Sequence, residues 1–311
     1  MPERSAFEGI VVLGSPRSGT TLIRRLLNGH PDINCPPETN LLNSAARFLE
    51  EHEFAGGLSV GVIPGLDFCG FDEQAVLDRL REFVFSFHRE LRDQAGKRYW
   101  AEKTAFDIFH LDAVEKLCVG HCRFICVTRH ALDVCVSIRD LTDEMQMYLP
   151  ELHQYIKRYP APLEAFAHAW VDVNQRLLRF IDCWPNVCHR PRYESLVSEP
   201  QSTLQSLFEW LQLTTDVPAL LDAAMSGTAD VGLGDWKTYR SRRIDSGRTQ
   251  RWKELPADRL ARLAAIVNPT LEQLGYDAVQ ADAQLSGADA RRRYQISQKV
   301  AQMGTAKERG T

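Results

Sequence analysis

The sequence lacks several features that would place it in other classes of protein. No apolar stretch reaches about 18 residues, the length that a membrane-spanning helix needs. The charged first residues have no apolar signal core behind them, so we expect a cytoplasmic protein that does not act at a membrane. The 311 residues carry 37 Lys and Arg against 41 Asp and Glu, and this slight acidic excess argues against a nucleic-acid partner.

The eight cysteines also lack the spacing of a metal site. They are scattered, mostly in apolar surroundings, and no pair of Cys-x-x-Cys motifs indicates zinc. Buried free thiols in a reducing cytosol are the ordinary interpretation of such a pattern. We therefore expect free thiols and no metal.

The order of the apolar runs indicates the fold class. Short runs that suit buried strands alternate with longer stretches of helical periodicity, as in proteins built on a parallel sheet. The predicted strands are GIVVLG (9–14), RYWAEKT (98–104), CRFICVTRH (122–130) and VCHRPRYESLV (187–197). We expect one α/β domain over residues 1–280, with a P-loop-like parallel sheet and helices on both faces. An apolar content of 44% is enough for its core.

Three stretches lack clear periodicity. Phe54–Phe71 and Asp140–Pro162 are interpreted as long loops, which are often lids or substrate walls but are also found as plain surface loops. Residues 281–311 are polar and basic, and we expect a flexible tail or a linker there.

The segment VVLGSPRSGTTLIRRLLNGH, Val11 to His30, predicts an anion site. A glycine-rich turn between a buried strand and a helix points backbone N–H groups at a phosphate, and the helix dipole adds to the attraction. The residues that could bind the anion are Arg17, Ser18, Gly19, Thr20 and Thr21. Nucleotide triphosphatases carry a lysine where this chain has Thr20, so ordinary ATP hydrolysis is disfavoured.

A second strand, turn and helix follow in FICVTRHALDVCVSIRD (124–140). Arg129 comes at the end of the strand, where open α/β sheets bind ligands, and Ser137 follows about two helical turns later. Alone, Arg129 could be a salt-bridge partner and Ser137 an ordinary helix serine. Together with the first loop they suit a ligand that has two separated phosphate groups.

These two motifs resemble those of the sulfotransferases that use 3′-phosphoadenosine 5′-phosphosulfate (PAPS). GSPRSGTT is similar to the loop that binds the 5′-phosphosulfate, and VTRHALDVCVS is similar to the arginine and serine motif that binds the 3′-phosphate. The resemblance implies the fold of that family and these donor contacts. It also implies that Tyr193, in RYESLVSEP, lies near the adenine.

RTQRWKEL resembles the family's C-terminal basic loop, which closes over the nucleotide. The resemblance implies contacts from Arg251 and Trp252, with Ser246 and Arg248 as weaker candidates. The basic run around these residues, Lys237 to Lys253, is also compatible with a solvated loop or a nucleic-acid contact.

HPDINCPPETNLL is similar to a segment of the protein-tyrosine sulfotransferase branch that ends in a glutamate base, which implies Glu38 as the base here. Small-molecule members of the family instead carry a histidine two residues after a strand-end lysine. EKTAF keeps Lys103 but has Ala105 at that place. The resemblance thus implies Lys103, with Arg17, as the cations that stabilise the leaving group.

Less specific interpretations of the same residues stay open. Glu38 could be an exposed loop residue, and Lys103 could form a surface salt bridge with Glu102 or Asp107. His110 and His153 are fallback bases.

The expected reaction is sulfuryl transfer from PAPS to a hydroxyl, with release of adenosine 3′,5′-bisphosphate. The expected acceptor is an intracellular metabolite or a natural-product intermediate, free or held on a carrier protein. Two alternatives stay open, a nucleotide kinase or NTPase with a degenerate loop and a non-catalytic nucleotide-binding module. No pattern indicates an oligomeric state.

Overall fold

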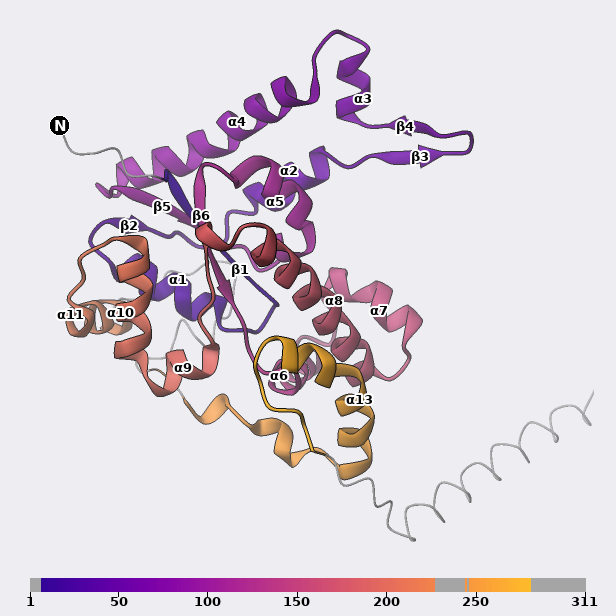
Figure 1. Ribbon diagram of the computed structural model, residues 1–311, viewed down its shortest axis with the longest axis vertical. Helices are drawn as coiled ribbons and strands as arrows, with labels where there is room; N and C mark the ends of the chain where they lie inside the picture. Colours follow the sequence, from indigo (N-terminus) through magenta and orange to yellow (C-terminus); the bar gives the residue numbers. More distant parts are fainter. Residues whose placement is uncertain (1–6, 227–243, 245, 281–311) are drawn as a thin grey trace, which may run out of the picture.

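The computed structural model describes residues 7–226, 244 and 246–280. Within them, five strands form one parallel sheet in the order β2-β5-β1-β6-β7 (Figure 1). The strands are β1 (Gly9–Gly14), β2 (Ile33–Asn34), β5 (Tyr99–Glu102), β6 (Cys122–Val127) and β7 (Cys188–His189). Helices lie on both faces of this sheet, so the predicted fold class is confirmed.

The centre of the sheet is the pair β1 and β6. Their register runs from Gly9 opposite Cys122 to Gly14 opposite Val127, and every residue of β1 is buried. Such continuous burial is typical of a parallel strand covered on both faces, and it explains the uninterrupted apolar run. The carboxyl ends of β5, β1 and β6 meet at one edge of the sheet, where ligands bind in open α/β folds.

Side chains of β1 alternate between two apolar cores. Ile10 and Val12 pack on the side of α1 (Thr20–Gly29), α9 (Tyr193–Ser198), α10 (Pro200–Leu211) and α11 (Val217–Ser226). Val11 and Leu13 pack on the side of α2 (Leu41–Phe48), α4 (Glu73–Gln94), α5 (Leu111–Cys118) and α8 (Pro162–Cys183). This period of two follows from strand geometry.

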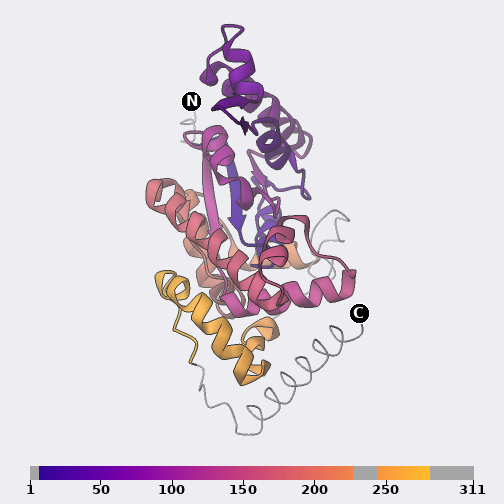
Figure 2. The same cartoon turned by 90° about the vertical axis from the view of Figure 1, so that its right-hand side faces the viewer.

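A third core lies beyond the end of the sheet. It joins α8 to α6 (Ala131–Met145), α7 (His153–Arg158) and α13 (Ala257–Gln273). Figure 2 shows α13 at one end of the molecule and the segment from β3 to α4 at the other. None of the described helices is long and apolar enough to cross a membrane.

Three sequence-based expectations about local structure need correction. The run 187–197 is not one long strand, because only Cys188–His189 pair in the sheet before a single bridge at Arg192 and helix α9. Phe54–Phe71 holds the end of a hairpin, β3 (His52–Phe54) and β4 (Leu58–Val60), and α3 (Val62–Asp67), which project from the body (Figure 1). Asp140–Pro162 holds the end of α6, η2 (Pro150–Leu152) and α7.

These elements are too short to show a periodic pattern in the sequence. The tail predicted for residues 281–311 lies outside the described residues.

All eight cysteines lie in the described part of the chain as free thiols, and five of them are buried. Cys69 and Cys183 are exposed, however, so burial does not extend to the whole set.

Candidate active site

The first loop folds as a strand-to-helix turn that needs both of its glycines. Gly19 has φ 91° at the start of α1, and a Cβ there would lie 2.3 Å from the ring of Tyr193. A Cβ on Gly14 would lie 2.8 Å from the carbonyl oxygen of Val127. The side chain of Ser18 is buried, and its hydroxyl has no hydrogen-bond partner among the described residues. A bound anion oxygen would supply that partner.

The second motif meets the first one directly. Arg17 Nε donates to Ser137 Oγ at 3.1 Å, and Arg129 Nη1 donates to the carbonyl oxygen of Arg17 at 2.7 Å. The Arg129 guanidinium also lies 4.2 Å from the centre of the Tyr193 ring. Burial lowers the pKa of Arg129, while nearby Tyr193 and Asp133 favour its charged form. Two arginines and one serine from separate motifs therefore share one location.

Lys103 extends from the end of β5 and joins the candidate base to the loop. Its ammonium donates to Glu38 Oε1 in a close ion pair and to Thr21 Oγ1 at 3.1 Å. The two charged side chains are only 1% and 7% exposed. The exposed-loop interpretation of Glu38 and the surface salt bridge of Lys103 are therefore wrong. A buried charge is tolerated when it is paired and hydrogen-bonded, as each is here.

The fallback bases have no comparable partners. His110 lies in η1 (Asp107–His110), and burial lowers the pKa of its imidazole. His153 begins α7. Within the described residues neither histidine forms a hydrogen bond or an ion pair with Glu38 or Lys103.

A buried polar group behind Lys103 was not predicted from the sequence. Glu102 accepts from Thr39 Oγ1 at 2.6 Å and from Thr104 Oγ1 at 2.5 Å. His88 Nε2 lies 3.4 Å from Glu102 Oε2, and the ring stacks on Trp100. Burial raises the pKa of Glu102 to about 7 and lowers that of His88 to about 4. All four residues of β5 are buried, so no alternation of polar and apolar residues in this strand indicates from the sequence that Glu102 is buried.

The C-terminal basic loop docks on α6 beside Arg129. Arg251, in η5 (Arg251–Glu254), pairs with Asp140 at 2.8 Å. Trp252 stacks on His130, with ring centroids 5.0 Å apart. Asp133 accepts the backbone N–H of Gln250 at 2.7 Å and that of Trp252 at 3.4 Å. These contacts hold the loop in place through α6.

One of the weaker candidates of this loop, Arg248, contacts the second motif directly. Arg129 Nη2 donates to the carbonyl oxygen of Arg248 at 2.6 Å, in η4 (Ser246–Arg248). Arg248 is thus in direct contact with Arg129, whereas Arg251 is tied to Asp140.

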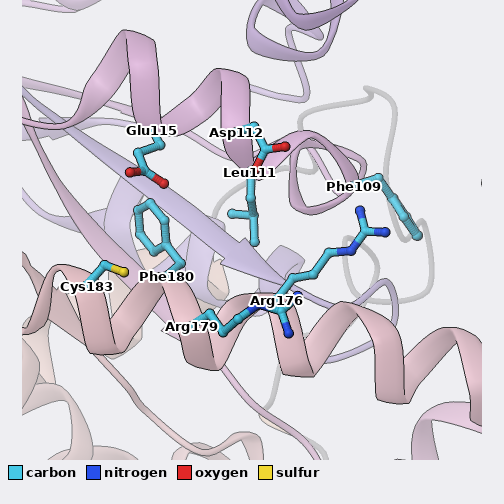
Figure 3. Close-up of a pocket in the computed structure, with 8 residues that line it drawn as sticks. All are labelled: Phe109, Leu111, Asp112, Glu115, Arg176, Arg179, Phe180 and Cys183. Atoms are coloured by element: carbon cyan, nitrogen blue, oxygen red, sulfur yellow. The ribbon is translucent and has the colours of Figure 1, made fainter.

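A separate cleft of about 500 Å³ lies between α8 and the segment from η1 to α5 (Figure 3). Its lining residues are Phe109, Leu111, Asp112, Glu115, Arg176, Arg179, Phe180 and Cys183. None of them belongs to the group around Arg17 and Lys103, so the cleft is distinct from the site described above.

Comparison with known proteins identifies the family. A model described as the sulfotransferase family matches residues 9–217, which is more than half of the chain. The chain belongs to the sulfotransferase family. Because the chain belongs to this family, the alternative of a nucleotide kinase or NTPase with a degenerate loop is no longer supported.

Two curated relatives are similar to this sulfotransferase over most of its length. A putative protein-tyrosine sulfotransferase of Caenorhabditis briggsae is 26% identical, over 88% of this chain and 91% of the relative. The nodulation protein NoeE of Sinorhizobium fredii is 25% identical, over 86% of this chain and 65% of the relative.

A solved structure shares the fold. The sulfotransferase domain from a Synechococcus olefin synthase is 23% identical, with a TM-score of 0.58, over 89% of this chain and 98% of that one. Its fold supports the sheet and helix arrangement described above.

Proposed function

We propose that this sulfotransferase moves the sulfuryl group of PAPS to a hydroxyl and releases adenosine 3′,5′-bisphosphate. The observation that carries the proposal is the direct contact between the two anion motifs, through Arg17, Ser137 and Arg129. A donor with phosphate groups at both its 5′ and 3′ positions needs two such sites within one nucleotide length. A ligand with a single phosphate chain would not require the second.

The residues of the first loop suit the 5′-phosphosulfate. Arg17, the buried hydroxyl of Ser18, and the N–H groups around Gly19 would bind its oxygens, with Thr20 and Thr21 at the start of the helix. Because Gly14 and Gly19 lack a Cβ, the Val127 carbonyl oxygen and the Tyr193 ring can pack directly against the loop.

The residues of the second motif suit the 3′-phosphate and the base. Arg129 and Ser137 would bind the phosphate, and Arg248 joins them because its backbone already contacts Arg129. Tyr193 lies against both Gly19 and Arg129, which favours a place beside the adenosine. Arg251 and Trp252 would cover the site on the side of α6, because their side chains contact the residues of that helix and its N-cap.

The Glu38–Lys103 pair suits the chemical step. The acceptor oxygen would form a bond to sulfur while the bond between sulfur and the bridging oxygen breaks. Glu38 would take the hydroxyl proton, and the electron pair of the broken bond would stay on the phosphate oxygen. Lys103 contacts both Glu38 and Thr21, so one ammonium would serve the base and the leaving group.

The acceptor is proposed to be an intracellular metabolite or a natural-product intermediate, free or carrier-bound. Support comes from the fold shared with a domain of an olefin synthase and from the likeness to a nodulation protein. The likeness to a putative protein-tyrosine sulfotransferase makes a phenolic hydroxyl a reasonable first probe. Turnover is proposed to need no metal.

Calorimetry with three ligands tests the donor assignment. Adenosine 3′,5′-bisphosphate should bind, AMP should bind more weakly, and ATP with Mg²⁺ should show no preference over AMP. Equal binding of AMP and the bisphosphate would refute the second phosphate site. Turnover of PAPS with a panel of hydroxyl acceptors then separates an enzyme from a non-catalytic binding module.

A further inference from the structure

Behind the Glu38–Lys103 pair lies a buried carboxylate to which the proposed chemistry gives no task. Glu102 precedes Lys103 at the end of β5, and its side chain is 1% exposed. A buried glutamate at the end of an interior strand destabilises the fold unless its oxygens accept hydrogen bonds. Its contacts therefore indicate what it does.

The two hydrogen bonds that Glu102 accepts both lead to the loop that carries Glu38. Its two oxygens accept the hydroxyls of Thr39 and Thr104. Those hydroxyl oxygens in turn accept backbone N–H groups, that of Leu41 on Thr39 at 3.3 Å and that of Asn40 on Thr104 at 3.1 Å. One carboxylate thus holds residues 39–41 through two hydroxyls.

The held segment contains a residue in an uncommon backbone conformation. Asn40 has φ 57°, in the left-handed region, and it lies directly before α2. The side chain of Asn40 itself makes no capping hydrogen bond to α2. Asparagine adopts this conformation more readily than most residues, and the hydrogen bonds around it stabilise it there. Thr39 and Asn40 connect Glu38 to α2, so the direction in which Glu38 points depends on the conformation of these two residues.

The ionised carboxylate accepts one hydroxyl on each oxygen, whereas an amide has only a donor on one side and a neutral acid carries a proton on one of its oxygens. Burial raises the pKa of Glu102 to about 7, the nearby Glu38 adds to this effect, and the two hydroxyl bonds and Lys103 oppose it. The other titratable groups around it are His88 on α4, Asp107 on η1 and Cys35 after β2.

We infer that Glu102 is a positioning residue for sulfuryl transfer, whose carboxylate holds the Glu38 loop against Lys103 through Thr39 and Thr104. The kinetic consequence rests on the proposed function, but the effect on the loop does not. Asp107 offers a matched control. It is equally buried beside Glu102, yet its side chain has no hydrogen bond within the described residues.

Hydrogen–deuterium exchange tests the hold on the loop without any acceptor. At pH 8, Glu102→Gln should speed the exchange of the Asn40 and Leu41 amides about 10-fold, the loss of one hydrogen bond, while Asp107→Asn should leave them unchanged. Thr39→Val should speed the exchange of the Leu41 amide, whose acceptor it removes, and Thr39→Ser should not, which keeps the test valid if Glu102→Gln does not fold. Unchanged exchange in both Glu102→Gln and Thr39→Val would overturn the inference.

Kinetics with PAPS and phenol test the consequence for turnover, because an ordinary phenol titrates at about pH 10 and stays neutral at about pH 7. Glu102→Gln should lower kcat about 10-fold with the KM for PAPS unchanged. Wild-type kcat should fall as pH drops through about 7, and Glu102→Gln should lose that part of the profile. A variant that raises KM instead, or keeps the same profile, would contradict positioning. If the wild type makes no bisphosphate at all, the proposed function fails, and the exchange experiment still decides the role of Glu102.

Discussion

Replacing Glu38 by glutamine tests the base assignment most directly. The side chain keeps its size and can still accept from Lys103 through its amide oxygen, but it loses the charge and the ability to take a proton. Loss of a general base lowers turnover on the order of 10²–10⁴-fold, or about 3–5 kcal/mol in activation free energy. We expect this fall in kcat, measured as bisphosphate formed from PAPS, with unchanged bisphosphate binding in the calorimeter.

The same substitution also leaves Lys103 buried without its counter-charge. Removing one partner of a buried pair destabilises a protein by about 3–5 kcal/mol, so the melting temperature of Glu38→Gln should fall. The double variant Glu38→Gln with Lys103→Gln removes the uncompensated charge and should regain much of this stability without regaining turnover. Near-normal kcat in Glu38→Gln would refute the assignment. Recovery of turnover in the double variant would show that only stability had been lost.

Three further predictions follow from other contacts. Gly19→Ala should destabilise the fold by about 1–3 kcal/mol and weaken bisphosphate binding, because a Cβ would meet the Tyr193 ring at a positive φ; thermal unfolding with and without ligand measures both effects. Arg129→Ala should weaken bisphosphate binding about 100-fold in calorimetry, since charged hydrogen bonds are lost. AMP, which has no 3′-phosphate, should bind the wild type and this variant alike. Burial lowers the pKa of His130 to about 4, so the unfolded chain binds more protons below pH 6.5 and the His130 contribution to stability is lost as pH falls toward 4. His130→Phe, which keeps a ring on Trp252, should lose stability less steeply than the wild type over that range in urea unfolding.

The anion motifs could be predicted from the sequence because each is local. A phosphate loop needs a strand, a turn and a helix in immediate succession, so Gly14 to Thr21 carry the whole pattern in one short segment. The serine two turns after Arg129 is local in the same way. The apolar run of β1 was equally informative, since burial on both faces leaves no polar position in it.

Other features could not be predicted because their cause is not local. The role of Glu102 depends on Thr39, which is 63 residues away in the sequence, and on a loop that it touches only after folding. The end of β7 at His189 is decided by where the chain must turn into α9. The attachment of Arg251 to Asp140 likewise depends on how the C-terminal segment docks on α6.

The amino-acid sequence alone determined the sheet class and the family resemblance, and it predicts an anion site at each loop, because backbone propensity and the phosphate turn act over a few neighbouring residues. Only the tertiary structure decided that Arg17 meets Ser137, that Lys103 pairs with Glu38, and that a buried carboxylate lies behind them. Those contacts arise from parallel strands whose ends converge at one edge although they are far apart along the chain. Burial then shifts the pKa values of groups such as Glu102, and a linear pattern does not show this shift.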